Sequence, residues 1–294
     1  MNSEQSRQFT LNSPQSTVHS LAFTLAETLI VMGIIGVVAA LTIPNVNKNT
    51  GEAEKVARFK KLYAELSEAH DRATAVYGPV EKWFVNDNAY EKRAERYLNR
   101  ITEFMKVTKT CDSNESSEVE CMTKGVKTFL YGGTTTGGIY KCFDYKSAIL
   151  ANGASFGINI YPIGCGYYMY DSTNKKKIYC GLINLDIDGP QRGKNTYGID
   201  LFSLAITTEG IKPAAGPDPS TGYNAPAGFS TTYLANNMQL ITYYGFAAGQ
   251  WIMDNGNMDY LNTKDRTDKT LSRTCKNGKI LGYNTAEGEA HSCK

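Results

Sequence analysis

The sequence predicts an α+β fold in which one long N-terminal helix, with a membrane half and an amphipathic half, packs on a small antiparallel β-sheet head. An almost uninterrupted apolar run predicts the first half, and helical spacing of apolar residues predicts the second. Beyond about residue 110, abundant Gly and Tyr favour short strands. The 294 residues therefore divide into an N-terminal segment (1–22), an apolar helix (23–43), amphipathic and second helices (44–110), a β-rich head (111–210) and a variable C-terminal region (211–294).

The apolar run is long enough to cross a membrane as one helix. At about 1.5 Å per residue, residues 23–43 span roughly 31 Å, close to the thickness of the hydrocarbon layer. A membrane anchor or an uncleaved export signal would explain this length, but neither explains Glu27. A charged side chain at a helix centre in the bilayer costs about 2.5–3.5 kcal/mol, so such residues usually have a partner. A cut just before Phe23 would expose a positive α-amino group at a similar depth.

The residues around Glu27 resemble the processing motif of type IV prepilins and type II secretion pseudopilins. The motif consists of Phe23-Thr24-Leu25, Glu27 in the fifth place and the long apolar helix, with Pro44 where many pilins place a helix-bending proline. The resemblance implies that a prepilin peptidase cuts between Ala22 and Phe23, so that residues 1–22 are a leader peptide, and that it methylates the new amine. It also implies that Glu27 pairs with the Phe23 amine of a neighbouring subunit. Ala22 stands where the family usually has Gly, and the leader is less basic than is common there.

This resemblance implies a structural subunit of a type IV pilus-like filament or of a type II secretion pseudopilus, with a pilin-like fold. Its partners would be copies of itself or other pilins or pseudopilins, the prepilin peptidase and the inner-membrane assembly platform. The precursor would be a single-pass protein of the bacterial inner membrane with an extracytoplasmic head, and the mature subunit would join a periplasmic or extracellular filament. The alternative is a membrane-tethered extracytoplasmic binding module that does not polymerise.

Two further helical segments are expected after the apolar run. From residue 51 to Tyr77, apolar side chains recur every three or four residues, and Gly78-Pro79 ends the pattern. This segment is expected to continue the apolar helix, with a bend at Pro44. Residues 90–106 repeat the spacing with aromatic side chains, which predicts a second helix packed on the core.

Short strands are expected in the head, because runs of β-branched and aromatic residues alternate with turn residues. Ala151-Asn152-Gly153 is typical of a hairpin turn between two of them. Loops are expected at Glu209-Gly210, 213–219 and 221–228, where Gly and Pro accumulate. The expected strands are 126–130, 147–150, 155–160, 178–187 and 201–207.

Residues 184–202 form the best candidate for a ligand site. Asp186, Asp188 and Asp200 could bind Ca²⁺ through their carboxylates, together with backbone carbonyls of the Gly-rich loop. The spacing is not that of an EF-hand loop. The simpler interpretation, which we favour for three carboxylates over 15 residues, is a turn whose Asp side chains accept hydrogen bonds from backbone N–H groups. No other cofactor is expected.

The seven cysteines all follow the apolar run and include no Cys-x-x-Cys pair, which favours an exported domain in an oxidising compartment. The odd number leaves one thiol over, and the spacing leaves the pairing open. Cys275 and Cys293 bracket the polar end of the chain. Many pilins close a C-terminal loop with a disulfide, so the resemblance makes these two a candidate pair. Cys111 and Cys121 bracket an acidic loop in the same way.

Neither catalysis nor nucleic-acid binding is expected. The histidines are His19, His70 and His291, and the sequence has no nucleophile elbow, phosphate loop or His-rich metal motif. The formal net charge is +2 without a broad basic stretch, which argues against a nucleic-acid surface.

Overall fold

A computed structural model describes residues 25–85, 87, 89–112, 121–122, 146–160, 165, 167–170, 176–214, 238–264, 272–283 and 289–293. Within these ranges, only the backbone is described for residues 39–50, 167–170, 176–178 and 239–240. The chain forms two compact units, residues 1–49 and residues 50–294. The leader, the cleavage position at Ala22 and Phe23 and the expected strand 126–130 lie outside the described residues.

The first helix, α1 (Leu25–Tyr77), is 53 residues long and is helical through Pro44. It ends where the sequence predicts, because Gly78 takes a positive φ of 78° and Pro79 cannot continue the hydrogen bonding. The bend at Pro44 stays a prediction, since the side chains of residues 39–50 are not described. The other described helical elements are η1 (Val80–Lys82), α2 (Tyr90–Thr102), α5 (Gln239–Thr242), α6 (Ala248–Asn255) and η2 (Asp259–Asn262).

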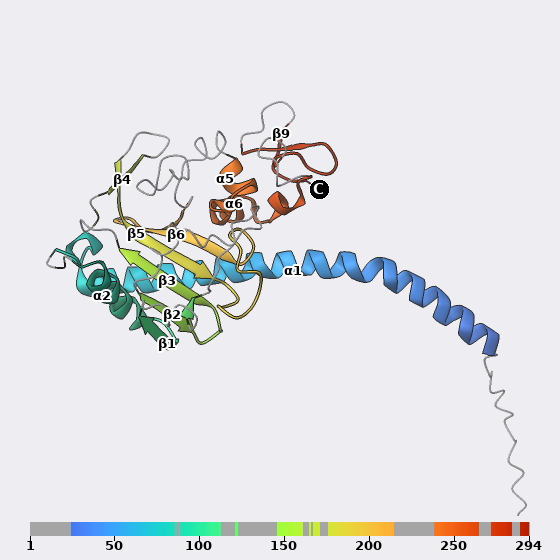
Figure 1. Ribbon diagram of the computed structural model, residues 1–294, viewed down its shortest axis with the longest axis horizontal. Helices are drawn as coiled ribbons and strands as arrows, with labels where there is room; N and C mark the ends of the chain where they lie inside the picture. The colour runs from blue at the N-terminus through green and yellow to red at the C-terminus, as the bar shows by residue number, and fades with distance from the viewer. Residues whose placement is uncertain are drawn as a thin grey trace, which may run out of the picture. The chain divides into compact units, whose positions relative to one another are not determined.

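Among the described residues, the main sheet has seven strands, and every pair of them is antiparallel. The strand order is β1-β2-β3-β5-β6-β7, and β4 pairs with β5 beside this path (Figure 1). A short parallel pair, β8 with β9, lies near the C-terminus. The strands are β1 (Val107–Asp112), β2 (Lys146–Leu150), β3 (Ser155–Ile160), β4 (Tyr167–Tyr170), β5 (Lys176–Asp186), β6 (Leu201–Thr207), β7 (Gly210–Pro213), β8 (Ile280–Leu281) and β9 (Glu289–Ala290).

The predicted fold class, a pilin-like α+β arrangement with a membrane half of the first helix and a small head sheet, is wrong. Within the residues described, no helix combines the length and the apolar character that a membrane crossing requires. The long helix α1 is not an apolar one, because charged residues recur along it from Lys48 onward. The sheet is also larger than expected, since β1 and β7 form edge strands from segments that the sequence analysis did not assign to strands.

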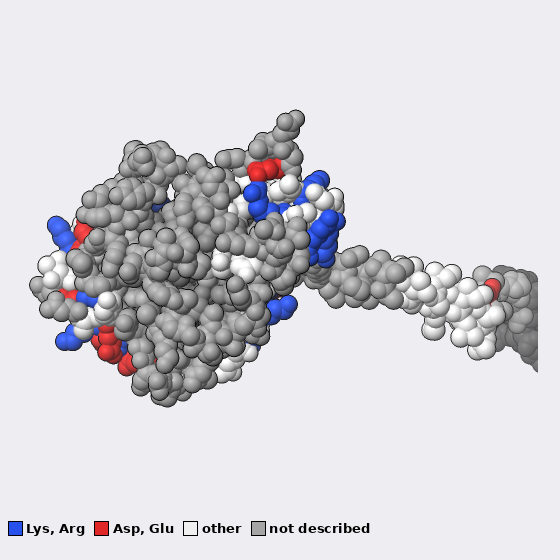
Figure 2. Space-filling view, turned by 45° about the horizontal axis from the view of Figure 1, so that its top comes forward, with Lys and Arg blue, Asp and Glu red and all other residues white. Residues whose placement is uncertain are grey.

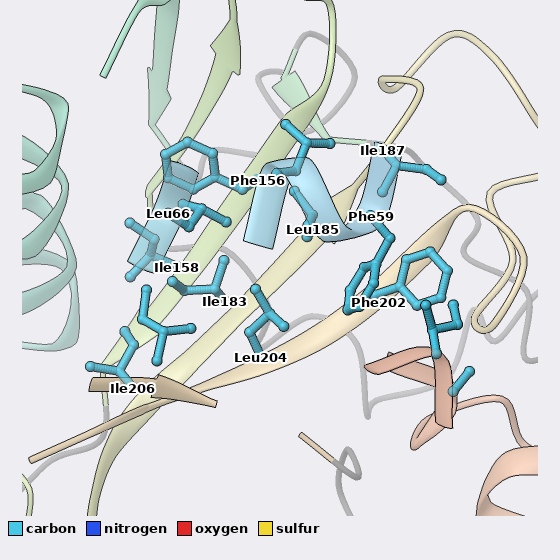
Figure 3. Close-up of a cluster of buried hydrophobic side chains, with 14 of the residues drawn as sticks. Phe59, Leu66, Phe156, Ile158, Ile183, Leu185, Ile187, Phe202, Leu204 and Ile206 are labelled. Carbon is cyan, nitrogen blue, oxygen red and sulfur yellow. The ribbon is translucent and has the colours of Figure 1, made fainter. Parts of the chain in front are cut away.

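The core of the second unit lies between α1 and one face of the sheet (Figure 3). Alternate residues of the three central strands point to this face, as the two-residue period of a strand requires. Phe59 of α1 meets them, and its ring centroid lies 4.6 Å from that of Phe202. The labelled side chains from the strands are Phe156, Ile158, Ile183, Leu185, Phe202, Leu204 and Ile206, and the labelled Ile187 directly follows β5.

The residues after β7 share this core. Met238, Trp251 and Tyr260 are buried in the same hydrophobic cluster as the sheet. Trp251 of α6 packs edge-on against Tyr260, with ring centroids 6.4 Å apart. At about 25 cal/mol per Å² of apolar surface, such large side chains contribute substantially to the stability of the unit. The described part of the C-terminal region is therefore integral to the head rather than a loose addition.

Candidate functional site

The first candidate site is the apolar segment of α1 from Leu25 to Val38. Every described side chain in this segment is exposed, and its nine large apolar side chains retain 53–80% of their accessible surface. Glu27 is exposed among them. The segment contains no Lys or Arg, and its described part is drawn mostly white in Figure 2. The nine are Leu25, Leu29, Ile30, Val31, Met32, Ile34, Ile35, Val37 and Val38.

This distribution differs from that of an ordinary surface helix. A surface helix has one apolar stripe that faces its own domain, whereas a helix that is apolar all round is normally covered on all sides. Monomeric soluble proteins rarely expose apolar patches of more than a few hundred Å². An exposed apolar segment of this kind is typical of surfaces that protein or lipid covers.

The second candidate site is the loop between β5 and β6, which contains the three predicted Asp residues. Asp186 is the last residue of β5, and Asp200 immediately precedes β6. The loop is closed at its base by a hydrogen bond from Ile187 N to Asp200 O, at 2.9 Å. The structure thus brings Asp186, Asp188 and Asp200 into one loop, as the sequence predicts.

Asp200 organises the C-terminal half of this loop, next to β6. Its buried carboxylate accepts hydrogen bonds from the backbone N–H groups of Lys194, Asn195 (3.0 Å) and Thr196 (2.6 Å). Burial raises the pKa of Asp200, although these N–H donors act in the opposite direction. Gly193 suits this position, because its φ of 73° favours glycine and a Cβ here would press on the carboxylates of both Asp188 and Asp200.

Asp186 organises the N-terminal half, next to β5, in a similar way. Its Oδ1 accepts hydrogen bonds from the backbone N–H groups of Asp188, at 3.3 Å, and Gly189, at 2.9 Å. The turn-capping interpretation is therefore confirmed for Asp186 and Asp200. The pKa of Asp186 is raised to about 8, chiefly by burial and in addition by the neighbouring carboxyl group of Asp188.

Calcium binding by all three Asp side chains stays a prediction. Among the described residues, no three His, Cys, Asp or Glu side chains are grouped so that they could hold a metal ion. Asp200 is also poorly placed to bind an ion, because its carboxylate oxygens already accept three backbone hydrogen bonds. Asp186 and Asp188 are then the two carboxylates of this loop that remain for a ligand.

Three disulfides are present in the head. They are Cys111–Cys121, Cys165–Cys180 and Cys275–Cys293, so the predicted C-terminal pair is confirmed. The pairing of Cys165 with Cys180 was left open by the sequence, because Cys142 lies at a comparable distance along the chain. Cys142 itself is outside the described residues.

His70 has a structural role. Its ring is buried between α1 and α2, where Nδ1 lies 2.9 Å from the Tyr97 hydroxyl. Burial lowers the pKa of His70 to about 4, and Asp71 offsets this only in part, so the ring is neutral at pH 7. Sequence analysis placed His70 on the amphipathic helix but gave no sign of its partner.

No protein-family model, curated protein or solved structure matches this chain.

Proposed function

We propose that this chain is a filament subunit of the type IV pilus or type II secretion pseudopilus kind, which assembles through its N-terminal helix after residues 1–22 are removed. The observation that carries the proposal is the segment Leu25–Val38, whose apolar side chains are exposed all round. A second copy of the same segment is its occupant. The processing motif that ends at Glu27 supports this choice over a lipid-only anchor, which has no use for a carboxylate at that place.

The apolar side chains and Glu27 contribute differently to the free energy of assembly. Packing one apolar helix against another is nearly neutral when the helix leaves lipid, because lipid is as apolar as Leu or Ile. Apolar contacts also set the position of one helix along its neighbour only weakly. An ion pair between Glu27 of one copy and the Phe23 amine of the next fixes this position, since a charge left unpaired among apolar side chains is costly.

Mass spectrometry of the N-terminus, on protein from its native host, tests the processing step. We expect a chain that begins with a methylated Phe23. A membrane-tethered module that does not polymerise predicts instead that residues 1–22 are retained or that the cut lies elsewhere, and this result would refute the proposal.

Substitution of Glu27 tests the assembly step. Removing one partner of a buried ion pair costs about 3–5 kcal/mol, so Glu27→Gln and Glu27→Ala should reduce incorporation into sheared filaments by roughly 100-fold or more. Both variants should still be processed and should keep a folded head. Glu68→Gln, which neutralises an exposed Glu of the second unit, is the matched control and should assemble normally. Normal filaments from the Glu27 variants would contradict the role given to this residue.

A further inference from the structure

The segment 276–280, near the C-terminus, forms an exposed turn, which we call the basic turn. Every residue in it is exposed. A hydrogen bond from Cys275 N to Lys279 O, at 2.8 Å, closes the base of the turn, and Gly278 supplies the positive φ of 88° at its tip. The disulfide Cys275–Cys293 anchors the same base covalently. The basic turn is therefore exposed at its tip but fixed at its base.

The exposed charge around the basic turn is positive. Among the described residues from 259 onward, the exposed Lys, Arg, Asp and Glu side chains are Lys264, Lys276 and Lys279. Lys264 lies beside the turn, because its backbone N–H donates to Thr274 O at 2.6 Å. Glu289 forms an ion pair with Arg273, and Asp259 is buried. Figure 2 shows Lys and Arg side chains gathered at the end of the head where Figure 1 draws the C-terminal segment. The whole chain, by contrast, has a formal net charge of only +2.

Ile280 places a large apolar side chain next to these lysines. It is 44% exposed, and it is the one exposed large apolar side chain among the described residues from 259 onward. Its backbone pairs with Thr274 and with Glu289, so the direction of its side chain is fixed by β8. Neighbouring side chains of a strand point to opposite sides, which sends Leu281 into the core and Ile280 outward. A surface that combines lysines with an exposed apolar side chain offers both charge attraction and apolar burial to a partner.

The C-terminal segment lies beside the first turns of α1 in the second unit. Burial raises the pKa of Tyr260, and the nearby charge of Glu52 raises it further. Tyr260 and the basic turn belong to one layer, because Thr263 pairs with Cys275 at the base of the turn. Glu52 follows the last apolar residue of the N-terminal run, Ile43, by nine positions. At no more than about 3.6 Å per residue, the chain keeps this layer within roughly 32 Å of any lipid that covers the run.

We propose that the basic turn binds the surface of a lipid bilayer that contains anionic phospholipids. The negative surface attracts the lysines, whose aliphatic stems follow the interface while the ammonium groups reach the phosphates. Ile280 leaves water and enters the boundary between headgroups and acyl chains. A soluble polyanion such as nucleic acid would use the lysines but would offer Ile280 no apolar phase. The inference goes beyond filament assembly and does not depend on it, because Glu27 and the Phe23 amine take no part in this contact.

Lysine labelling of the full-length chain tests the proposal. The protein, with its disulfides intact, is transferred from detergent into an excess of vesicles, made either of phosphatidylcholine alone or of phosphatidylcholine with phosphatidylglycerol. An amine-reactive reagent is added, and mass spectrometry measures the labelling rate at each lysine. With the anionic vesicles, Lys276 and Lys279 should react about five-fold more slowly, which is the effect of roughly 1 kcal/mol per lysine at such a surface. Lys82 and Lys92, which are exposed on η1 and α2, are the controls in the same sample and should keep their rates.

Salt and one pair of variants separate the two parts of the contact. Sodium chloride at about 1 M should restore fast labelling, because it shortens the screening length to about 3 Å. Ile280→Ser should weaken the slowing of Lys276 and Lys279, whereas Val85→Ser, at a side chain that is 73% exposed, should leave it unchanged. Full slowing in Ile280→Ser would contradict the choice of a lipid surface over a soluble polyanion. Equal rates at these two lysines with both kinds of vesicle would overturn the proposal, and the filament proposal would still stand, because it depends on Glu27.

Discussion

The two described apolar surfaces of α1 contrast with each other, although both belong to the same helix. In the second unit, Phe59, Leu66 and Ala73 are fully buried against the head. In the first unit, residues 25–38 keep their apolar side chains exposed. The difference is one of pattern, because the residues after Thr50 form a single apolar stripe with charged residues opposite. A stripe can be covered by one neighbouring layer of the same chain, whereas a helix that is apolar all round needs several neighbours.

The largest effect on the free energy of unfolding is expected from a substitution in the buried part of α1. Phe59→Ala should lower the free energy of unfolding by about 3–5 kcal/mol, because it leaves a cavity where the ring meets Phe202. Urea unfolding followed by the fluorescence of Trp83 and Trp251, both buried, measures this loss. Ile34→Ala, in the exposed segment, is the matched control and should change the value by less than about 0.5 kcal/mol. Equal losses of unfolding free energy in the two variants would mean that the exposed and the buried apolar side chains of α1 contribute equally to stability.

The next effect concerns pH. The folded protein holds the pKa of His70 at about 4, while the unfolded chain has the ordinary value of 6.5. Between these values the unfolded state takes up a proton that the folded state does not. Lowering the pH from 6.5 to 4 should therefore reduce stability by about 3 kcal/mol through this residue.

Urea unfolding at a series of pH values, with wild type and His70→Gln compared, isolates this contribution. The variant keeps a group that can bond with Tyr97 but does not titrate, so its stability should fall less over the same range. His291→Gln, in the C-terminal tail, should follow the wild type. If His70→Gln and wild type have the same pH dependence, the buried half of α1 does not hold His70 neutral.

The smallest effect is expected on the charged side of α1. Glu68 and Arg72 form an ion pair four residues apart, and both side chains are more than half exposed. Such pairs contribute about 0.3–0.5 kcal/mol, and salt screens them. Glu68→Gln should therefore reduce stability by no more than this amount in urea unfolding, and 1 M salt should remove the difference. A loss above 1 kcal/mol would mean that this side of the helix also takes part in packing.

The sequence predicted the central strands well. β3 and β6 begin and end at the predicted residues, because alternating Phe, Ile and Leu side chains are bounded by clear turn residues. The edge strands were missed. Thr108, Lys109 and Thr110 of β1 are exposed and have the character of loop residues, and they form a strand only because β2 offers an edge to pair with. β7 contains Gly210 and Pro213, which likewise favour a loop until β6 is in place.

The candidate sites were predictable in part. The chemistry of Asp186, Asp188 and Asp200 could be read from the loop between two strands, including their action as turn caps. The burial of Asp186 could not, because it depends on the pairing of β5 with β6 and on the layers that cover them.

The three described disulfides have a consequence for how the head folds and oxidises. The three bonds join cysteines that are 10, 15 and 18 positions apart. Cys142, by contrast, stands 21 positions after Cys121 and 23 before Cys165. A flexible chain brings nearby thiols together more often than distant ones, so oxidation before folding already favours the native partners. The chain can therefore acquire these three crosslinks with little reshuffling of disulfides.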